Sequence, residues 1–443
     1  MQFHVLSFEG PDAYARVGGL ASRVEGLVGA VAEAAHPTHL WFVGDPTLPG
    51  QETRGALALH RWCQWISAYH PGGVYDGEED KQRDFGASLP PYLLDELLGP
   101  ELRGGGRAVV LAEEWQTVGA TLHLDALLRE RGLRERVAIF WNANNTFGFE
   151  KIDWPRLAAA ARITTVSRYM KHRMWSLGAD PLVIPNGLPP DCFAPPDRGA
   201  VAALRARLSD RTLLAKLARW DPDKRWLAAV DLVAEMKRQG WRPLLIARGG
   251  SEQHRDEVLS AARSQQLRVV ERSASRPGGD GLVGALGDSN GADVIELRSA
   301  VDPEARRVLF RSSHAVLANS GHEPFGLVGL EAMAAGGVAC TGCSGEDYAV
   351  PGHNALVLET GDPREFLGLF SQLSREPDRE RSLRRAGVAT ARCYAWPEVL
   401  RRILLPRLEL HAQQQLTPQR RRVARAARSI AVSRPTAPLV HAG

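Results

Sequence analysis

The sequence has few cysteines, no long apolar run and only a slight charge imbalance. Its 443 residues include 5 cysteines, an odd and small number that suits a reducing cytoplasm. No apolar run approaches a membrane span, and the first residues lack the basic segment and apolar core of a signal peptide. A formal net charge of +4 gives no reason to expect a nucleic-acid partner, although an anionic ligand would not be repelled. We expect a soluble, cytoplasmic protein.

Two series of alternating strand and helix patterns follow one another along the chain. The first begins with a strand at 3–8 and a helix at 20–35, and the second begins with a strand at 213–218. Such alternation predicts two parallel sheets covered by helices. Further strands are expected at 40–43, 108–111, 137–140, 163–166, 182–184, 244–247, 294–297 and 315–318. Residues 273–291 are rich in glycine, serine and aspartate and are expected to form a surface loop.

The chain is expected to divide near the segment 189–199, whose proline and aspartate content is typical of a linker. We assign 1–188 to a first domain, 189–212 to the linker and the start of a second domain, and 213–395 to that second domain. Residues 413–443 contain 6 arginines and no acidic residue. This segment is expected to be a mobile basic tail, and the alternative is a short helix that binds an acidic partner.

A pair of glutamates follows the strand expected at 315–318. Pro324 fits the first position of a helix that Gly336 ends. Glu331 leans toward the apolar face of this helix and has no lysine or arginine three or four residues away, so its carboxylate needs a partner from elsewhere. Glu323 precedes the helix, beside backbone N–H groups that have no partner inside it. These N–H groups, with Gly326 keeping the approach open, predict an anion site.

The glutamates are separated by seven residues, and the whole string E-P-F-G-L-V-G-L-E-A-M-A resembles the E-x7-E motif of retaining GT-B glycosyltransferases. This group includes glycogen and starch synthases and sucrose-phosphate synthases. The resemblance is strong from about 166 to 366 and weaker before residue 108. It implies two Rossmann-like, doubly wound α/β domains that face a cleft, with 396–412 forming a helix that crosses back onto the first domain.

The resemblance also implies a reaction. A hexosyl unit, expected to be glucosyl, would pass from a nucleoside-diphosphate sugar such as UDP- or ADP-glucose to a hydroxyl of a glucan or a small molecule, with retained anomeric configuration. Glu323 would lie near the transferred sugar, and Glu331 would accept hydrogen bonds from the ribose hydroxyls. The backbone amides of Phe325, Gly326 and Leu327 would face the sugar hydroxyls or the diphosphate.

Two cations follow the first strand of the second series. Arg219 and Lys224 resemble the R-x4-K pattern that holds the donor diphosphate in the family. Fixed positive charges suit this role, because cleavage of the sugar–phosphate bond leaves a diphosphate anion. Without the family, ion pairs with Asp221 and Asp223 would be an equal alternative. Because these cations and helix N-termini would supply the positive charge, neither a metal nor a cofactor is expected.

Glycines mark two further donor-binding candidates. Arg16, Gly18 and Gly19 resemble the K-x-G-G-L loop of starch and glycogen synthases, whose backbone amides approach a phosphate. Arginine in place of the usual lysine keeps the charge but changes the geometry, which leaves the donor sugar open. Gly249 follows the strand expected at 244–247, where family members place the nucleotide.

The acceptor half of the expected cleft departs from the family. Glu113 takes the place of a histidine that contacts the donor sugar in glycogen synthases, ahead of Trp115. Asn144 and Asn145 resemble only part of the family's T-x-H-N loop. These departures leave a non-catalytic sugar- or nucleotide-binding protein as an alternative. A glycoside hydrolase that uses the two glutamates as acid and nucleophile is a third interpretation. The acceptor, the donor base and the oligomeric state stay open.

Overall fold

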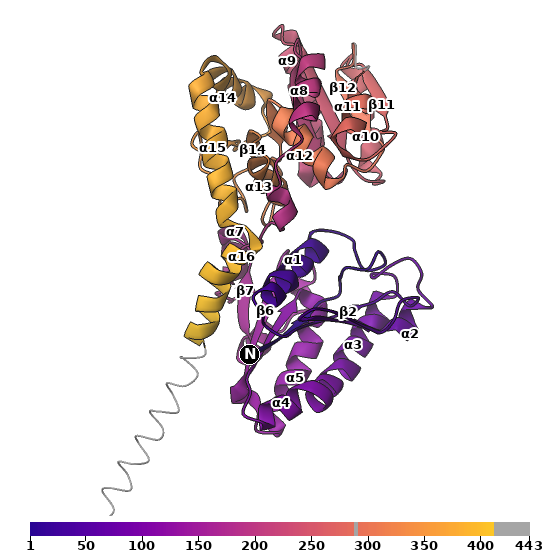
Figure 1. The fold of residues 1–443 in the computed structure, drawn as a ribbon, viewed down its shortest axis with the longest axis vertical. Coiled ribbons are helices and arrows are strands. Elements are labelled where there is room, and N and C mark those ends of the chain that lie inside the picture. Colours follow the sequence, from indigo (N-terminus) through magenta and orange to yellow (C-terminus); the bar gives the residue numbers. More distant parts are fainter. Residues whose placement is uncertain (288–290, 412–443) are drawn as a thin grey trace, which may run out of the picture.

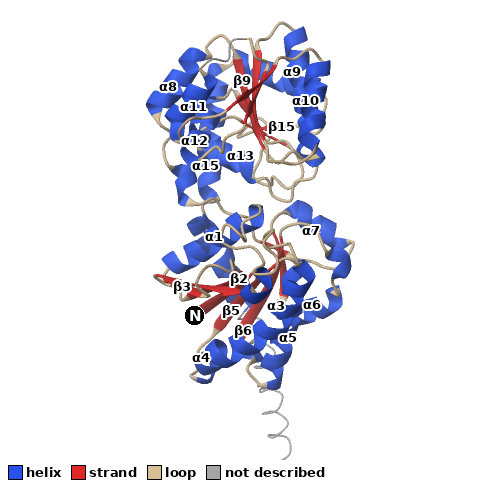
Figure 2. Cartoon of the chain, turned by 90° about the vertical axis from the view of Figure 1, so that its right-hand side faces the viewer, coloured by secondary structure: helices blue, strands red, loops and turns tan. Residues whose placement is uncertain are grey.

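The computed structural model describes residues 1–287 and 291–411, which form two lobes stacked along the long axis of the molecule (Figure 1). Each lobe has a central sheet with helices on its faces (Figure 2). This is the doubly wound α/β architecture that the alternation of strands and helices predicted. The basic segment expected at 413–443 lies outside the described residues.

The first lobe contains an 8-stranded sheet in the order β3-β4-β2-β1-β5-β6-β7-β8. Its strands are β1 Gln2–Leu6, β2 Thr38–Val43, β3 Gln51–Arg54, β4 Leu57–Trp62, β5 Ala108–Glu113, β6 Val137–Ala143, β7 Arg162–Thr165 and β8 Leu182–Val183. All neighbours run parallel except β3 and β4. The helices are α1 Gly19–Glu33, α2 Gln64–Ser67, α3 Glu78–Tyr92, η1 Leu93–Leu98, α4 Gly99–Arg103, η2 Trp115–Thr117, α5 Val118–Glu130, η3 Arg134–Arg136, η4 Phe149–Lys151, α6 Trp154–Ala160 and α7 Arg168–Trp175.

The second lobe contains a parallel 7-stranded sheet in the order β11-β12-β10-β9-β13-β14-β15. Its strands are β9 Thr212–Leu217, β10 Pro243–Arg248, β11 Val269–Arg272, β12 Val294–Leu297, β13 Ala315–Leu317, β14 Ala339–Thr341 and β15 Leu356–Val357. Its helices are η5 Pro190–Phe193, α8 Arg198–Arg207, η6 Pro222–Lys224, α9 Trp226–Arg238, α10 His254–Ser264, α11 Gly278–Leu286, α12 Pro303–Ser312, α13 Leu327–Ala334, α14 Pro363–Arg375 and α15 Pro377–Cys393. The central strands are short buried apolar runs, as expected for a sheet covered on both faces.

The last helical segment crosses back onto the first lobe, as the resemblance implied (Figure 1). It comprises α16 Trp396–Val399 and η7 Leu400–Leu404, and it packs on α1. The Trp396 indole lies between Gly26 of α1 and Gly187, where a Cβ on either glycine would overlap the ring. Beside this indole, the two segments that connect the lobes, one at Leu188 and one at 394–396, are hydrogen-bonded to each other. The Leu188 N–H donates to the Tyr394 carbonyl at 2.7 Å, and the Trp396 N–H donates to the Leu188 carbonyl at 3.1 Å.

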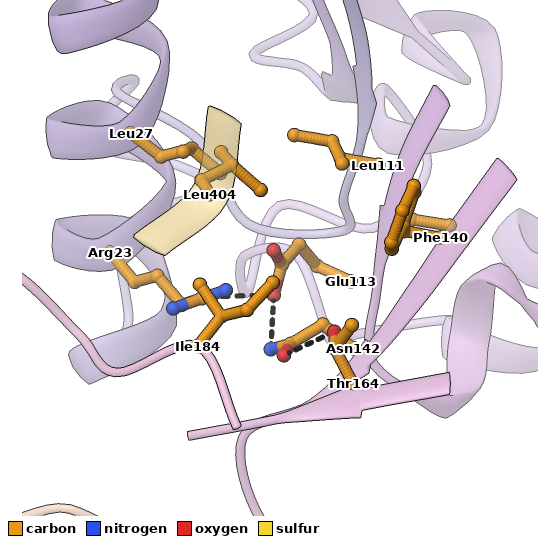
Figure 3. Close-up of a pocket in the computed structure, with 10 residues that line it drawn as sticks. Arg23, Leu27, Leu111, Glu113, Phe140, Asn142, Thr164, Ile184 and Leu404 are labelled. Carbon is orange, nitrogen blue, oxygen red and sulfur yellow. Dashed lines mark hydrogen bonds and ion pairs between the residues drawn. The ribbon is translucent and has the colours of Figure 1, made fainter. Parts of the chain in front are cut away.

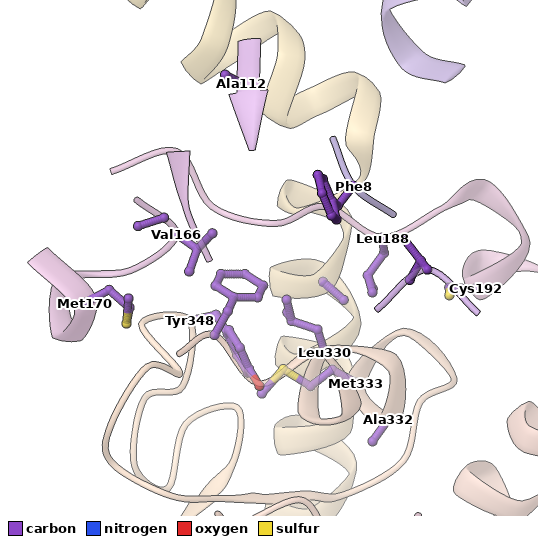
Figure 4. Close-up of a cluster of buried hydrophobic side chains, with 14 of the residues drawn as sticks. Phe8, Ala112, Val166, Met170, Leu188, Cys192, Leu330, Ala332, Met333 and Tyr348 are labelled. Carbon is purple, nitrogen blue, oxygen red and sulfur yellow. The ribbon is translucent and has the colours of Figure 1, made fainter. Parts of the chain in front are cut away.

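A continuous apolar cluster joins the lobes where the chain crosses (Figure 4). Val166 and Met170 belong to the first lobe, and Leu330 and Tyr348 belong to the second. A polar contact lies beside this cluster, because the backbone N–H of Arg168 donates to Oδ2 of Asp347 at 2.7 Å. The lobes are therefore packed against each other on the side of the crossings. Among the described residues, no helix is long and apolar enough to cross a membrane.

Two local predictions were wrong. The helix expected to begin at Pro324 begins at Leu327, because Gly326 has φ 75° in the left-handed region and ends the preceding loop as the N-cap. The loop expected at 273–291 contains helix α11. Its glycines disfavour a helix, but Leu282 and Leu286 are buried and α11 packs against α8 and α12, so tertiary contacts decide the conformation.

Candidate active site

A cleft of about 690 Å³ lies between the lobes and receives residues from both. The loops that form it leave the carboxyl ends of parallel strands, where ligands bind in open α/β sheets. It brings together most of the predicted site residues: Gly19, Asn144 and Asn145 of the first lobe, and Arg219, Lys224, Glu323, Phe325, Gly326, Leu327 and Glu331 of the second lobe.

The two predicted diphosphate-binding cations have different surroundings. Nζ of Lys224 donates to Oε2 of Glu323 at 2.6 Å, and both side chains are largely buried. The Arg219 guanidinium lines the cleft and has no ion-pair partner among the described residues. The alternative of pairing with the nearby aspartates is not realised, because Asp221 caps η6 by accepting from the N–H of Asp223 at 2.9 Å. Both cations therefore reach the cleft.

The backbone around Glu323 is held by the loop that follows β14. The backbone N–H of Glu323 donates to Oγ of Ser344 at 3.0 Å. Gly345 packs against the carbonyl oxygens of Glu323 and Pro324, so closely that a Cβ would overlap them. On the other side, the Tyr348 hydroxyl donates to the carbonyl of Gly326. These contacts fix the position from which the Glu323 carboxylate enters the cleft.

The partner that the Glu331 carboxylate required is Arg306 of α12. One guanidinium nitrogen of Arg306, Nη1, lies 3.1 Å from each oxygen of Glu331. Burial raises the pKa of Glu331, and the charge of Arg306 opposes that shift. The two residues line the cleft together, so the ion pair does not close the site beside Glu331.

The glycine loop before α1 faces a carboxylate of the chain itself. Oε2 of the buried Glu9 accepts from the N–H groups of Gly18 at 3.1 Å and Ala21 at 3.0 Å. The negative charge stabilises the helix N-terminus. Gly19 still lines the cleft, whereas Arg16 forms an exposed ion pair with Glu25 and does not contribute to its lining. The amide groups proposed for a phosphate are thus partly engaged by the protein.

Glu113 lies in a buried polar network (Figure 3) and is not part of the cleft lining. Its Oε2 accepts from Nε of Arg23 at 3.0 Å, from Nδ2 of Asn142 at 2.9 Å and from Nδ2 of Asn144 at 2.8 Å. Arg23 also donates from Nη1 to Oδ1 of Asn186 at 2.6 Å. Glu113 therefore reaches the cleft lining only indirectly, through Asn144 and, by way of Arg23, through Asn186, and not by the direct acceptor-side contact that was predicted.

Glu114, which the sequence did not single out, lines a second pocket of about 440 Å³. Its φ of 68° and ψ of 166° lie in a region that is almost confined to glycine. This strained backbone turns the carboxylate into the pocket, where it accepts from the Asn144 N–H at 2.6 Å. Burial, aided by the charge of Glu113, raises the pKa of Glu114 to about 8. Strain and a displaced pKa at one residue are typical of functional sites.

The second pocket opens beside the cleft, because Gly19, Asn145 and Arg219 line both. Gly18 and Trp115 also line it, and Nζ of Lys151 lies 4.1 Å from the centre of the Trp115 ring. Predicted donor-side and acceptor-side residues therefore meet in adjoining cavities.

Gly249 is not part of the cleft lining. It packs against the indole of Trp220, where a Cβ would overlap the ring. Lys216 and Arg306 also line the cleft, and neither was predicted as a site residue. The lysine lies within an apolar strand pattern, and that unusual charge in a buried strand is the one signal that could have identified it.

Comparisons with known proteins relate this chain to glycosyltransferases. Residues 290–389 match the family model of Glycosyl transferases group 1. The chain is 29% identical over 217 residues to D-inositol 3-phosphate glycosyltransferase of Segniliparus rotundus, which covers 48% of this chain and 43% of that protein. The match thus spans less than half the length of this curated relative.

Solved structures define the class of fold. Sucrose-phosphate synthase of Thermosynechococcus elongatus aligns with a TM-score of 0.65 at 18% identity, over 93% of this chain and 100% of that one. The catalytic domain of starch synthase IV from Arabidopsis thaliana, bound to ADP and acarbose, aligns with a TM-score of 0.65 at 15% identity, over 94% and 99%. The chain therefore has the GT-B fold, and a segment of its second lobe matches the family model of Glycosyl transferases group 1.

Proposed function

We propose that this protein is a retaining glycosyltransferase that moves a hexosyl unit, glucosyl in the first instance, from a nucleoside-diphosphate sugar to a hydroxyl acceptor. The observation that carries the proposal is the arrangement of Arg219, Lys224 and Glu323 in one interlobe cleft. Two cations there can bind a departing diphosphate, and the carboxylate can bind the hydroxyls of the sugar. The E-x7-E string and the match to group 1 glycosyl transferases support the same reaction.

The donor is assigned to the second lobe. Glu331 has one nitrogen of Arg306 on its two oxygens, which leaves a carboxylate that can also accept from ribose hydroxyls. The backbone of Phe325, Gly326 and Leu327 lies at the N-terminus of α13, which favours a negatively charged or hydroxyl ligand. Neither contact selects a base, so UDP- and ADP-glucose are both candidate donors.

The acceptor is assigned to the second pocket, beside Glu114 and Trp115. The described residues that line this pocket include four carboxyl groups, those of Glu9, Glu78, Glu114 and Glu150, and two cations, Lys151 and Arg219. Glu114, whose pKa is raised to about 8, holds a proton at neutral pH, and the other three carboxylates outnumber the two cations. The lining therefore favours the hydroxyl groups of an unphosphorylated polyol or glucan end over a phosphate. This differs from the sugar-phosphate acceptor that the name of the inositol-phosphate relative implies for that protein.

A donor and acceptor panel tests the proposal. UDP-, ADP- and GDP-glucose are offered with glucose, maltooligosaccharides, glucose 6-phosphate and inositol 3-phosphate, and nucleoside-diphosphate release is measured. We expect release that depends on an unphosphorylated acceptor and an α-linked product by NMR. The Glu323→Ala variant should be inactive, whereas Glu33→Ala, at an exposed site on α1, should keep wild-type activity.

Other outcomes would favour the alternatives. Release of free sugar from glycosides without a nucleotide would indicate a glycoside hydrolase. Tight nucleotide-sugar binding without turnover of any pair in the panel would indicate a binding protein. A product with inverted configuration would overturn the retaining mechanism but leave the donor assignment standing.

A further inference from the structure

A lysine is buried in the floor of the cleft without a counter-charge. Lys216 lies on β9, three residues before Arg219, and its side chain is 1% exposed. Lys216 is nevertheless among the residues that line the cleft, together with Arg219, Lys224 and Glu323. A charged group in such a position requires compensation, because removing an ammonium from water is costly.

The contacts of Lys216 supply only part of that compensation. Nζ donates to the carbonyl of Leu317 at 3.1 Å and lies 5.4 Å from the centre of the Trp226 ring. No carboxylate among the described residues forms an ion pair with it. An ammonium has three N–H donors, so two remain without a protein partner. Glu323, whose negative charge also acts on Lys216, is already paired with Lys224.

The pKa of Lys216 is set by its burial and by charged groups on the elements around it. Burial, together with the charges of Lys224 and Arg225, lowers the pKa of Lys216 to about 7. Cys340 of β14 and the Glu323 carboxylate act in the opposite direction. The net surroundings are therefore cationic and dry, which suits an anion that enters from the cleft.

We infer that Lys216 is a third cation of the donor site, which binds the diphosphate of the nucleotide sugar together with Arg219 and Lys224. The inference rests on the proposed function and extends its ligand set to a residue of the strand itself. The bound anion supplies the missing counter-charge and two acceptors for the free N–H groups. Donor binding is then coupled to proton uptake, because the anion favours the charged form of the amine.

Isothermal titration calorimetry on the full chain tests this inference. Inorganic pyrophosphate, UDP and ADP are titrated at pH 7.5 in HEPES and in Tris, whose different ionisation enthalpies report the protons exchanged. We expect Lys216→Met to weaken binding roughly tenfold or more, the effect of one charge-assisted hydrogen bond. Terminal phosphates also titrate near neutral pH, so the readout is the proton uptake of the wild type minus that of the variant.

Two controls separate the ligand role from a structural one. Lys237→Met removes a lysine that pairs with Asp293 outside the cleft, and it should change neither affinity nor proton uptake. Lys216→Arg should retain a measurable part of the affinity, since it keeps the charge. Without ligand, Lys216→Met should melt at a higher temperature than the wild type, because it removes a buried charge.

The outcomes distinguish this inference from the proposed function. If the wild type binds UDP or ADP and Lys216→Met binds it equally well with equal proton uptake, Lys216 is not part of the donor site. If the wild type binds neither the nucleotides nor pyrophosphate, the donor site itself is wrong. A variant that melts at a lower temperature and binds weakly would identify Lys216 as a structural residue.

Discussion

The ammonium nitrogen of Lys224 lies 2.6 Å from Oε2 of Glu323, so the two side chains neutralise each other on the second-lobe side of the cleft. One is the proposed partner of the diphosphate and the other of the sugar. Under the proposed assignment, a donor diphosphate would compete with Glu323 for Lys224, and its binding would release the Glu323 carboxylate from the ion pair.

This pairing predicts opposite effects of Glu323→Gln on binding and on turnover. Loss of the carboxylate charge frees Lys224, and an ion pair of about 1 kcal/mol corresponds to roughly fivefold tighter binding of UDP or ADP. Turnover should fall roughly 100-fold or more, because the sugar loses its charged partner. Calorimetry and diphosphate release measure the two quantities. Weaker nucleotide binding in this variant would contradict competition for Lys224.

Substitution of glycine by alanine is expected to lower the stability of the protein at Gly345 and to raise it at Gly368. Gly345→Ala places a methyl group against the carbonyls of Glu323 and Pro324, which should destabilise the fold by about 1–3 kcal/mol and lower turnover. Gly368 lies in α14, where an added methyl group would meet no neighbouring atom within 4 Å, so alanine there should stabilise by up to about 1 kcal/mol. Denaturant unfolding and initial rates distinguish them. Equal stability changes would show that the Gly345 contact is unimportant.

Glu114 predicts a pH-dependent stability. Its folded-state pKa of about 8 exceeds the ordinary value of 4.5, so the folded protein holds a proton that the unfolded chain has lost between these pH values. Stability should therefore fall as pH rises through that window. Glu114→Gln mimics the protonated group, and its stability relative to the wild type should increase from pH 5 to pH 8. Melting curves across this range measure the difference, and a constant difference would contradict the raised pKa.

The buried pair of Arg23 and Glu113 predicts a large coupling. Glu113→Met leaves the Arg23 guanidinium without its carboxylate partner, which should cost about 3–5 kcal/mol, whereas the double variant Arg23→Met with Glu113→Met should cost less than the sum of the two single methionine variants. The exposed pair of Arg401 and Glu398 is the matched control, with an expected cost below about 1 kcal/mol. Denaturant unfolding of all variants gives the coupling. Additive costs at the buried pair would indicate independent roles.

Much of the architecture could be predicted because it depends on local patterns. Buried strands such as β5 and β9 are apolar runs, and the E-x7-E string identified the helix that carries Glu331. Helix α11 could not be predicted, since its glycines favour a loop and only contacts with α8 and α12 make it helical. Sequence reasoning thus succeeded where one segment determines its own conformation.

The site was predicted less completely, because side-chain direction depends on distant residues. Glu113 and Glu114 are neighbours, and a single strained backbone position sends one into a buried network and the other into a pocket. Glu9 accepts hydrogen bonds from the backbone amides of Gly18 and Ala21. It lies in a separate loop, so no local sequence spacing predicts this contact. The Arg306 partner of Glu331 was required by the sequence, but its identity came only from the packing of α12 on α13.

The paired crossings at Leu188 and Ala395 have a mechanical consequence. Both connections between the lobes lie side by side and are hydrogen-bonded to each other, and Trp396 is clamped between Gly26 and Gly187 next to them. A rotation of one lobe against the other must therefore use the two adjacent chain crossings as its hinge axis. Such a hinge changes the width of the far edge most and leaves the inner edge beside the crossings almost fixed.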